Sequence, residues 1–211
     1  MASKTEVCNL AISHLGIGKE IQDFETEKTS EAKTCRRFYD SALRRALRDF
    51  NWPFARRFFT LNLIESDPTT EWAYSYRYPS DAVMARRILS GTWPENNATL
   101  VPYLLAGDSS GRIIYSDQEN AVLEYTTFVE DPAFYSSDFE LAFSYLLAYY
   151  IAPRLTDVNF NLKEQMLTYY NLEIDSAMSN ANNEEQDARE VESEFIRVRS
   201  GYADSGHEIK R

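Results

Sequence analysis

The sequence predicts an α+β protein in which helices from both ends of the chain form a helical bundle and an antiparallel β domain is inserted between them. Apolar residues recur every three or four positions near both ends, whereas short stretches of alternating apolar and polar residues fill the middle. We therefore divide the 211 residues into bundle helices at 1–55, a β domain at 56–130, bundle helices at 131–181, and an acidic linker with a C-terminal arm at 182–211.

Two helices are expected in the first of these segments. Apolar residues at helical spacing occupy 3–15, and Gly16 follows them as a stop signal. Thr29 or Ser30 is suited to be the N-cap of the second helix. The tripeptide NWP at 51–53 ends that helix, because proline lacks an amide proton and restricts the residue before it.

The second helix combines an apolar face with a basic one. At about 100° per residue, Arg37, Arg44 and Arg48 share one face of the helix, with Asp40 beside them. The apolar residues on the opposite face are Ala32, Cys35, Phe38, Tyr39, Ala42, Ala46 and Phe50. The pattern predicts that one face is buried and that the three arginines are exposed.

The middle of the chain changes to short alternating stretches separated by turn sequences such as DPTT, YPSD and GDSSG. We expect four to six antiparallel strands between about Arg56 and Glu130. The candidate strands are 58–64, 72–78, 86–91, 100–107, 112–117 and 121–129.

Helical spacing returns in the last third of the chain. Ser137 and Glu140 have the S-x-x-E spacing of a capping box, and the helix they begin should reach about Thr156, bent or stopped at Pro153. A last helix is predicted at about 160–180.

The remaining C-terminal residues have a different composition. The stretch at 180–194 is polar and strongly acidic, as in a linker. Phe195, Ile196 and Val198 then form a small apolar patch, and we expect this tail to become ordered on a partner.

Charge is distributed unevenly along the chain, whose formal net charge is -11. Residues 29–57 carry eight basic and three acidic residues, a net of +5, and residues 117–194 carry three basic and seventeen acidic residues, a net of -14. Such asymmetry concerns partners rather than fold, and it suggests that copies of the chain meet basic face to acidic face.

Few residues point to catalysis or to a bound cofactor. The sequence has no phosphate-binding glycine loop and no zinc-type or nucleophile motif, so we expect no enzyme activity, cofactor or metal. His14 lies on the apolar side of the first helix and His207 lies near the end of the chain. Cys8 and Cys35 lack metal-ligand spacing and are expected to be buried thiols in a reducing compartment. The many carboxylates leave a glycosidase-type pair open.

Residues 1–4 lack the apolar region of a secretory signal, and the longest apolar run, 139–155, is too polar for a membrane span. The sequence therefore predicts a soluble intracellular protein without a membrane anchor. The basic helix is interpreted as a protein interface rather than a DNA-binding element, because its neighbouring aromatic residues Phe38, Tyr39 and Phe50 belong to the apolar face.

A series of short motifs resembles the head-to-tail connector (adaptor) family of short-tailed bacteriophages, the family of tail tubular protein A and related tail accessory factors. The matching stretches begin with NLAISHLGIGKE, include YSYRYPSDAVMARRI, and end with AVLEYTTFVEDPAFYSSDFELAFSYLLAYYIAPRLT. The motifs include a tyrosine–aspartate pair (Tyr39–Asp40), a W-x-F-A corner (Trp52–Ala55), and Y-x-Y-x-x-P-x-D (Tyr74–Asp81). The ordered series covers about Val7 to Ala181.

The resemblance implies a structural protein of the virion. Such proteins form a ring, typically of about twelve copies, below the portal protein after DNA packaging. They extend the DNA channel and offer a platform for the next tail component, a tail tube or nozzle protein. Genomic DNA passes through the ring without sequence-specific binding, and the acidic net charge suits a lumen to which DNA does not adhere. Assembly is expected in the cytoplasm of the bacterial host.

The resemblance also suggests which residues make the contacts. Arg37, Arg44 and Arg48 would meet an acidic surface on a neighbouring copy, near Asp138 and Asp175. The C-terminal arm would dock on the portal through Phe195, Ile196, Arg197, Val198 and Arg199.

Two other functions remain open at this point. The chain is alternatively a tail-associated peptidoglycan hydrolase that uses unrecognised carboxylates. It is alternatively a DNA-binding module that uses the stripe of Arg37, Arg44 and Arg48, with an affinity that falls as salt rises.

Overall fold

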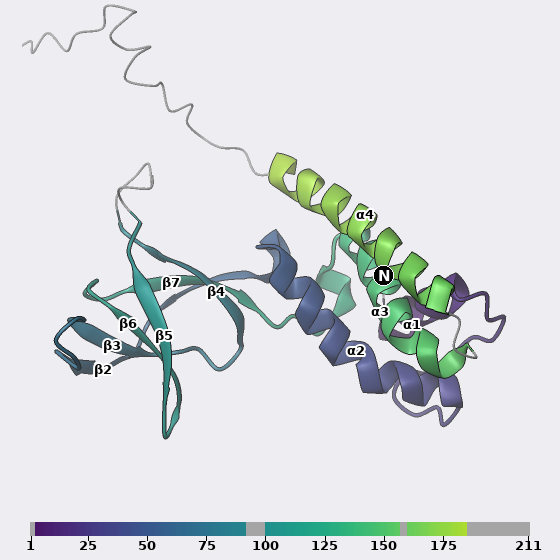
Figure 1. The fold of residues 1–211 in the computed structure, drawn as a ribbon, viewed down its shortest axis with the longest axis horizontal. Helices are drawn as coiled ribbons and strands as arrows, with labels where there is room; N and C mark the ends of the chain where they lie inside the picture. Colours follow the sequence, from purple (N-terminus) through teal and green to yellow (C-terminus); the bar gives the residue numbers. More distant parts are fainter. Residues whose placement is uncertain (1–2, 92–99, 157–159, 185–211) are drawn as a thin grey trace, which may run out of the picture.

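The computed structural model describes residues 3–91, 100–156 and 160–184. In these residues the helices gather at one end of the molecule and an all-antiparallel β region forms the other (Figure 1). The described elements confirm a mixed α and β protein with helices before and after the strands. In chain order the elements are α1 (Lys4–His14), α2 (Ser30–Asp49), η1 (Pro53–Ala55), β1 (Arg56–Thr60), β2 (Leu63–Ser66), β3 (Tyr74–Arg77), β4 (Ala82–Leu89), β5 (Tyr103–Asp108), β6 (Gly111–Ser116), β7 (Val122–Thr127), η2 (Pro132–Phe134), α3 (Ser137–Leu155) and α4 (Phe160–Glu184).

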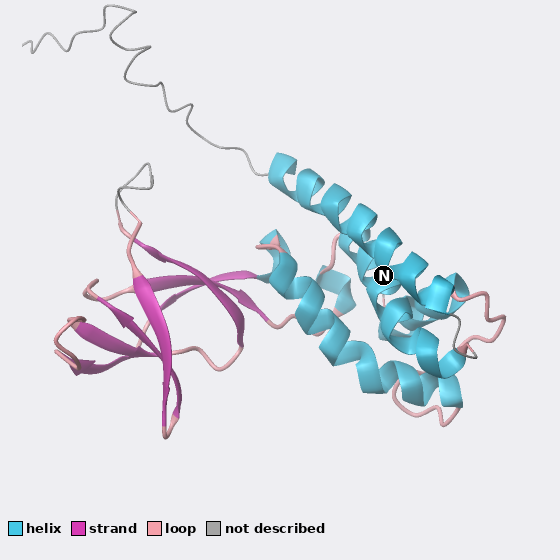
Figure 2. Cartoon of the chain, viewed as in Figure 1, coloured by secondary structure: helices cyan, strands magenta, loops and turns pink. Residues whose placement is uncertain are grey.

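The helices and the strands occupy separate parts of the molecule (Figure 2). Helix α3 packs against each of the other three helices, which explains why its sequence is apolar on nearly every side. Its fully buried large residues are Phe139, Phe143, Leu146, Leu147 and Ile151.

The helix starts agree with the sequence in one case and differ in another. Thr29 is the N-cap of α2, as predicted, and its hydroxyl accepts a hydrogen bond from the backbone N–H of Ala32. The prediction for α3 was wrong by one residue, because Ser136 rather than Ser137 is the cap and accepts from the N–H of Phe139. The S-x-x-E spacing favours Ser137, because only Ser137 has a glutamate three residues later, and this pattern therefore selects the wrong one of two adjacent serines.

One helix end agrees with the sequence prediction, since α3 ends within one residue of the expected Thr156, and another differs. Helix α3 includes Pro153 in its last turn and continues to Leu155. Helix α4 ends at Glu184 instead of about residue 180, so residues 182–184, assigned above to the linker, are helical. Burial of Ala181 extends the apolar face of α4 by one turn, which explains the longer helix.

Within the described part of the chain, seven strands form two sheets, where four to six strands were expected. One sheet has the order β1-β7-β4 and the other has the order β2-β3-β6-β5. The predicted strand at 58–64 is in fact two strands, since the chain changes partner at its centre. The N–H of Leu61 donates to the carbonyl of Ala121, and the carbonyl of Asn62 accepts from Arg77.

The two sheets enclose an apolar core of their own. Tyr76 and Ile114 come from the four-stranded sheet, and Ile88 and Leu123 come from the three-stranded sheet; all four are almost fully buried. These four side chains therefore turn toward the space between the sheets, whereas the edge strands β1 and β2 are exposed along most of their length.

Arg86 on β4 and Glu124 on β7 join the β region to the end of α2. The guanidinium of Arg86 donates to the carbonyls of Leu47, Arg48 and Phe50, which are free of helical partners at this helix end. Burial lowers the pKa of Arg86.

Glu124 is 2% exposed and is surrounded by donors. Its carboxylate lies 3.3 Å from Nε of Arg56 and 2.5 Å from Nε of Arg87, and it accepts from the side-chain amide of Asn51 at 2.5 Å. These contacts hold β1, β4 and the residues after α2 together, so the helices and sheets meet at a joint of buried polar groups.

The two cysteines are buried, as the sequence predicts, and neither is in a disulfide. The two thiols are in hydrogen-bond contact with each other, which could not be predicted because they are far apart in the sequence. The pKa of Cys8 is raised, first by the hydrogen bond to the thiol of Cys35 and second by burial. The thiol of Cys8 therefore stays protonated, and both buried side chains pack as small apolar groups between α1 and α2.

His14 makes the stability of the helical part depend on pH. Its ring stacks on Tyr145 at 3.9 Å, and its Nε2 lies 3.0 Å from the hydroxyl of Ser144. Burial lowers the pKa of His14 below that of the unfolded chain, so folding favours the neutral ring. Stability should be lost as the pH falls below the unfolded pKa of about 6.5.

This pH dependence is tested by urea denaturation between about pH 7.5 and 5.5, a range that spans the titration of histidine. We expect the free energy of unfolding to fall with pH in the wild type and to fall less in His14→Gln, which still offers Ser144 a polar partner. If the free energy of unfolding depended equally on pH in both proteins, His14 would not be the cause of the pH dependence.

Candidate interaction surfaces

The basic face of α2 is exposed, as the sequence predicts. Arg37, Arg44 and Arg48 are all exposed, and among the residues that the structure describes none of them has an ion-pair partner. Arg44 lies with its guanidinium 4.2 Å from the ring centre of Phe128, which holds this side chain against the loop after β7. The opposite face of α2 is buried through Ala32, Cys35, Tyr39, Ala42, Leu43, Ala46 and Leu47.

Two further arginines of α2 serve the fold instead. The guanidinium of Arg36 donates to the carbonyls of Phe24 and Glu27 and so fixes the loop before α2. Arg45 lies 3.4 Å from the hydroxyl of Tyr150 and 5.9 Å from the ring centre of Tyr170. The sequence reveals the density of arginine here, whereas the structure separates the exposed stripe from the internal contacts.

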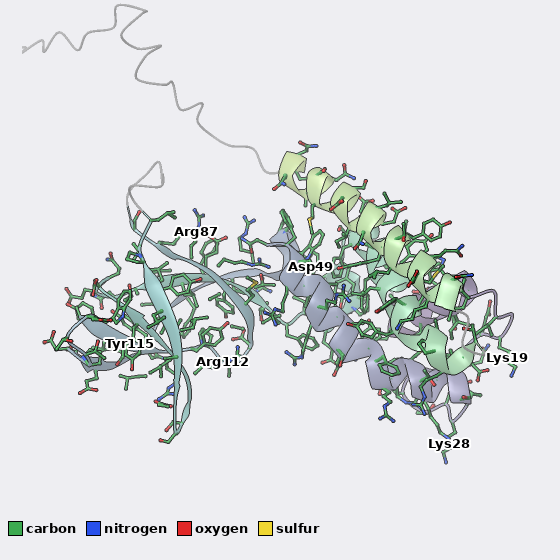
Figure 3. All side chains as sticks on the ribbon, in the orientation of Figure 1. Lys19, Lys28, Asp49, Arg87, Arg112 and Tyr115 are labelled. Atoms are coloured by element: carbon green, nitrogen blue, oxygen red, sulfur yellow. The ribbon has the colours of Figure 1, made fainter. Side chains whose placement is uncertain are left out.

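Helix α4 carries an acidic face. Glu164 and Asp175 are both exposed and lie about three turns apart on one side of the helix. The other side of α4 packs against α3 and reaches the end of α2, where the hydroxyl of Tyr170 donates to the carboxylate of Asp49. Asp49 lies at the end of α2 nearest the sheets (Figure 3). The acidic face of α4 therefore points away from α2 and does not neutralise its arginines.

The remaining predicted site residues lie elsewhere. Asp138 is half-buried near the start of α3, and its carboxylate accepts a hydrogen bond from the side-chain amide of Asn180 at 2.8 Å. It is thus already bound within the chain, unlike Asp175. The predicted arm residues, Phe195 to Arg199, lie outside the residues that the structure describes.

A polar cleft of about 820 Å³ lies between α2 and the sheets, and the sequence did not predict it. It is lined by Arg44 of α2, by Arg77 and Arg112 of the four-stranded sheet, and by Asp81 and Tyr125. Part of the Y-x-Y-x-x-P-x-D motif, from Arg77 to Asp81, lines the cleft. This motif is the sequence signal that could have indicated where the cleft lies.

Two of the polar side chains that line the cleft, Arg77 and Tyr125, are each held by a carboxylate. Arg77 binds Asp108 through two hydrogen bonds of 2.9 Å, and this bond lowers the pKa of Asp108. The hydroxyl of Tyr125 donates to Asp81 at 3.1 Å, and burial with that carboxylate raises the pKa of Tyr125 to about 12. A tyrosine with a raised pKa stays protonated at neutral pH, so its role is to hold Asp81 rather than to act as a base.

Arg112 supplies the remaining charge of the cleft, with its guanidinium 5.4 Å from the ring centre of Tyr78 (Figure 3 labels Arg112). Because Arg44 and Arg112 both face the cleft without an ion pair among the described residues, this cleft suits an anionic group such as a carboxylate. The basic surface of α2 thus continues onto the sheets.

The strands expose apolar side chains at the edges of both sheets. In the three-stranded sheet, Phe58 and Phe59 on β1 are exposed. In the four-stranded sheet, both outer strands, β2 and β5, carry exposed apolar side chains. Their exposed apolar residues are Leu63 and Ile64 on β2, and Leu104 and Leu105 on β5.

Within the described part of the chain, no cluster of three or more His, Cys, Asp or Glu residues is arranged to hold a metal ion. No helix in residues 3–91, 100–156 and 160–184 has the length and hydrophobicity to cross a membrane. The chain matches no protein-family model and no curated protein.

Proposed function

We propose that the chain is a structural virion protein, a head-to-tail adaptor that forms a ring below a phage portal. The observation that carries the proposal is the separation of charge within one chain. The exposed arginines of α2 and the exposed carboxylates of α4 point in different directions, so each face is complementary to the other face on a second copy. Head-to-tail contacts of this kind close into a ring when the rotation between copies permits.

In the proposed ring the helices of the two terminal segments form a bundle and pack side by side between copies. Arg37, Arg44 and Arg48 of one copy meet the acidic face that includes Asp175 on the next. The C-terminal arm at Phe195–Arg199 docks on the portal, and the β region faces the next tail component. The motif series in the sequence supports this arrangement by resemblance.

The proposed ring encloses DNA without holding it. The chain has a formal net charge of -11, and a dozen such copies repel the phosphate backbone. The exposed arginines are the observation that favours a second candidate, the DNA-binding module, and one experiment separates the two.

Reversing two charges of the stripe, Arg37→Glu with Arg48→Glu, should weaken addition of the chain to portal rings by at least tenfold, because like charges then face each other between copies. Arg44 is left unchanged, since it also contacts Phe128. Assembly is measured as mass added to the portal at physiological salt. Affinity for duplex DNA is measured in parallel by fluorescence anisotropy over a salt series.

A matched control reverses two lysines at the far end of the helical part, Lys19→Glu with Lys28→Glu (Figure 3). We expect this control to assemble like the wild type. Restored assembly on adding Glu164→Arg and Asp175→Arg to the first variant would identify the partner face. If the arginine variant assembles normally but loses salt-sensitive DNA binding, the chain is a DNA-binding module instead.

A further inference from the structure

The four-stranded sheet ends in two unpaired edges that resemble each other. Its order is β2-β3-β6-β5, so β2 and β5 each lack a partner strand on one side within the described residues. Each outer strand carries two neighbouring exposed apolar residues. Leu63 and Ile64 on β2 are 54% and 43% exposed, and Leu104 and Leu105 on β5 are 49% and 48% exposed. Open edges with apolar side chains are templates for pairing with another chain.

We propose that β2 of one copy pairs with β5 of the next, so that the four-stranded sheet continues from copy to copy. The proposal adds a contact between neighbouring copies of the adaptor. That such contacts close into a ring rests on the proposed function. The occupant of each edge is thus a second copy of this chain, and the contact is head-to-tail, like the charge contact between α2 and α4.

Strand direction permits this pairing. Every neighbouring pair in the sheet is antiparallel, and the sheet has four strands, so β2 and β5 run in opposite directions. A rotated copy therefore brings its β2 antiparallel to β5, and antiparallel pairing is slightly more stable per residue than parallel pairing. The three-stranded sheet differs, because its outer strands β1 and β4 run in the same direction and would have to pair in parallel.

The faces of the two edges also match. The registers place Leu63 opposite Tyr76, Tyr76 opposite Ile114, and Ile114 opposite Leu105. Residues opposite each other across strands share a face, so Leu63 and Leu105 both lie on the inner face, beside the buried core. Pairing Leu63 of one copy with Leu105 of the next extends that core across the interface.

The same register avoids opposing like charges. With Leu63 opposite Leu105 in antiparallel pairing, Glu65 meets Tyr103, and Asp108 lies toward Thr60. Charge complementarity between copies comes from the helices, where the basic face of α2 and the acidic face of α4 are both exposed. The sheet edges supply the backbone hydrogen bonds and apolar contacts that charge alone lacks at physiological salt.

Two edge variants of the full chain test the proposal, Leu63→Lys with Ile64→Lys on β2, and Leu104→Lys with Leu105→Lys on β5. All four positions are exposed, so the fold should be kept, as far-UV circular dichroism checks. Mass is followed by sedimentation equilibrium up to about 1 mM, which populates contacts with millimolar Kd. The wild type should rise above its chain mass of 24.4 kDa with concentration, and each variant should stay at that mass.

Mixing the two variants gives the decisive readout. Each variant keeps one intact edge, so the mixture should form species of twice the chain mass and no larger. A control with Phe58→Lys and Phe59→Lys on the three-stranded sheet should associate like the wild type. A wild type that stays at 24.4 kDa, edge variants that associate normally, or a mixture without dimers would each overturn the proposal.

The free chain alone is used, so the result does not depend on portal binding. Self-association through these edges in a chain that ignores the portal would refute the adaptor function and leave the edge pairing intact. Portal binding by a chain whose edge variants still assemble would refute the edge pairing alone.

Discussion

Replacing Trp52 by alanine is expected to lower the free energy of unfolding by about 4 kcal/mol, the range found for large aromatic residues in cores. Trp52 is fully buried where α2 ends, and its ring lies 4.9 Å from Phe139 and 5.0 Å from Phe50, measured between ring centres. Its indole N–H donates to the carbonyl of Ala46 at 2.9 Å. The substitution leaves a cavity and removes the hydrogen bond to the Ala46 carbonyl, and two costs therefore add.

Guanidinium chloride denaturation followed by circular dichroism measures this loss as a lower midpoint at unchanged slope. The control is Trp52→Phe, which keeps an aromatic ring but removes the N–H donor, and we expect it to cost about 1–2 kcal/mol. A Trp52→Ala variant as stable as this control would show that the ring does not carry the packing of the helical core.

Replacing Glu124 by glutamine is expected to cost about 3 kcal/mol. Glu124 is nearly fully buried between Arg56 and Arg87, so the neutral amide removes a buried negative charge that both guanidinium groups contact. The arginines are partly exposed and regain some hydration, which places the cost at the lower end of the range for buried pairs. Since Glu124 also holds Asn51, the variant should loosen the connection between helices and sheets.

A matched substitution at a surface ion pair provides the comparison. Asp108→Asn removes a carboxylate from the exposed pair with Arg77 and should lower the free energy of unfolding far less than Glu124→Gln, because water screens an exposed ion pair. Both variants are measured by the same denaturation. Hydrogen exchange of β7 and the end of α2 should also rise in Glu124→Gln and not in Asp108→Asn. Equal losses of stability in the two variants would contradict the role of the buried joint.

The sequence predicts the helices of this protein well because each carries its own signal. The apolar spacing of α2 places Ala42 and Ala46 on a buried face and Arg37 on an exposed one, and Thr29 marks its start. Local patterns of this kind do not require knowledge of the rest of the fold. The N-cap of α3 is Ser136, whereas the sequence predicts Ser137, so local patterns locate a helix start only to within about one residue.

Features made by distant residues could not be predicted in the same way. Alternation identifies strands but not their partners, so the division into two sheets and the switch at Leu61 appear only in the structure. The cleft near Arg112 and Asp81 joins segments far apart in sequence, as does the contact between Cys8 and Cys35. The surroundings of a residue, rather than its type, decide whether it is available for a partner.

Asp138 and Asp175 illustrate this difference. Both were chosen from the sequence as acidic interface residues. The structure leaves Asp175 exposed and binds Asp138 to Asn180. We therefore expect the acidic contact between copies to depend on the exposed face of α4 more than on the start of α3.

The most direct test of the adaptor function is the mass of the cognate phage portal ring, measured by mass photometry with and without this protein at physiological salt. The account predicts that the portal gains about a dozen copies of the 24.4 kDa chain and that the gain saturates there, as a closed ring requires. A portal whose mass does not change at any protein concentration would contradict the proposed function.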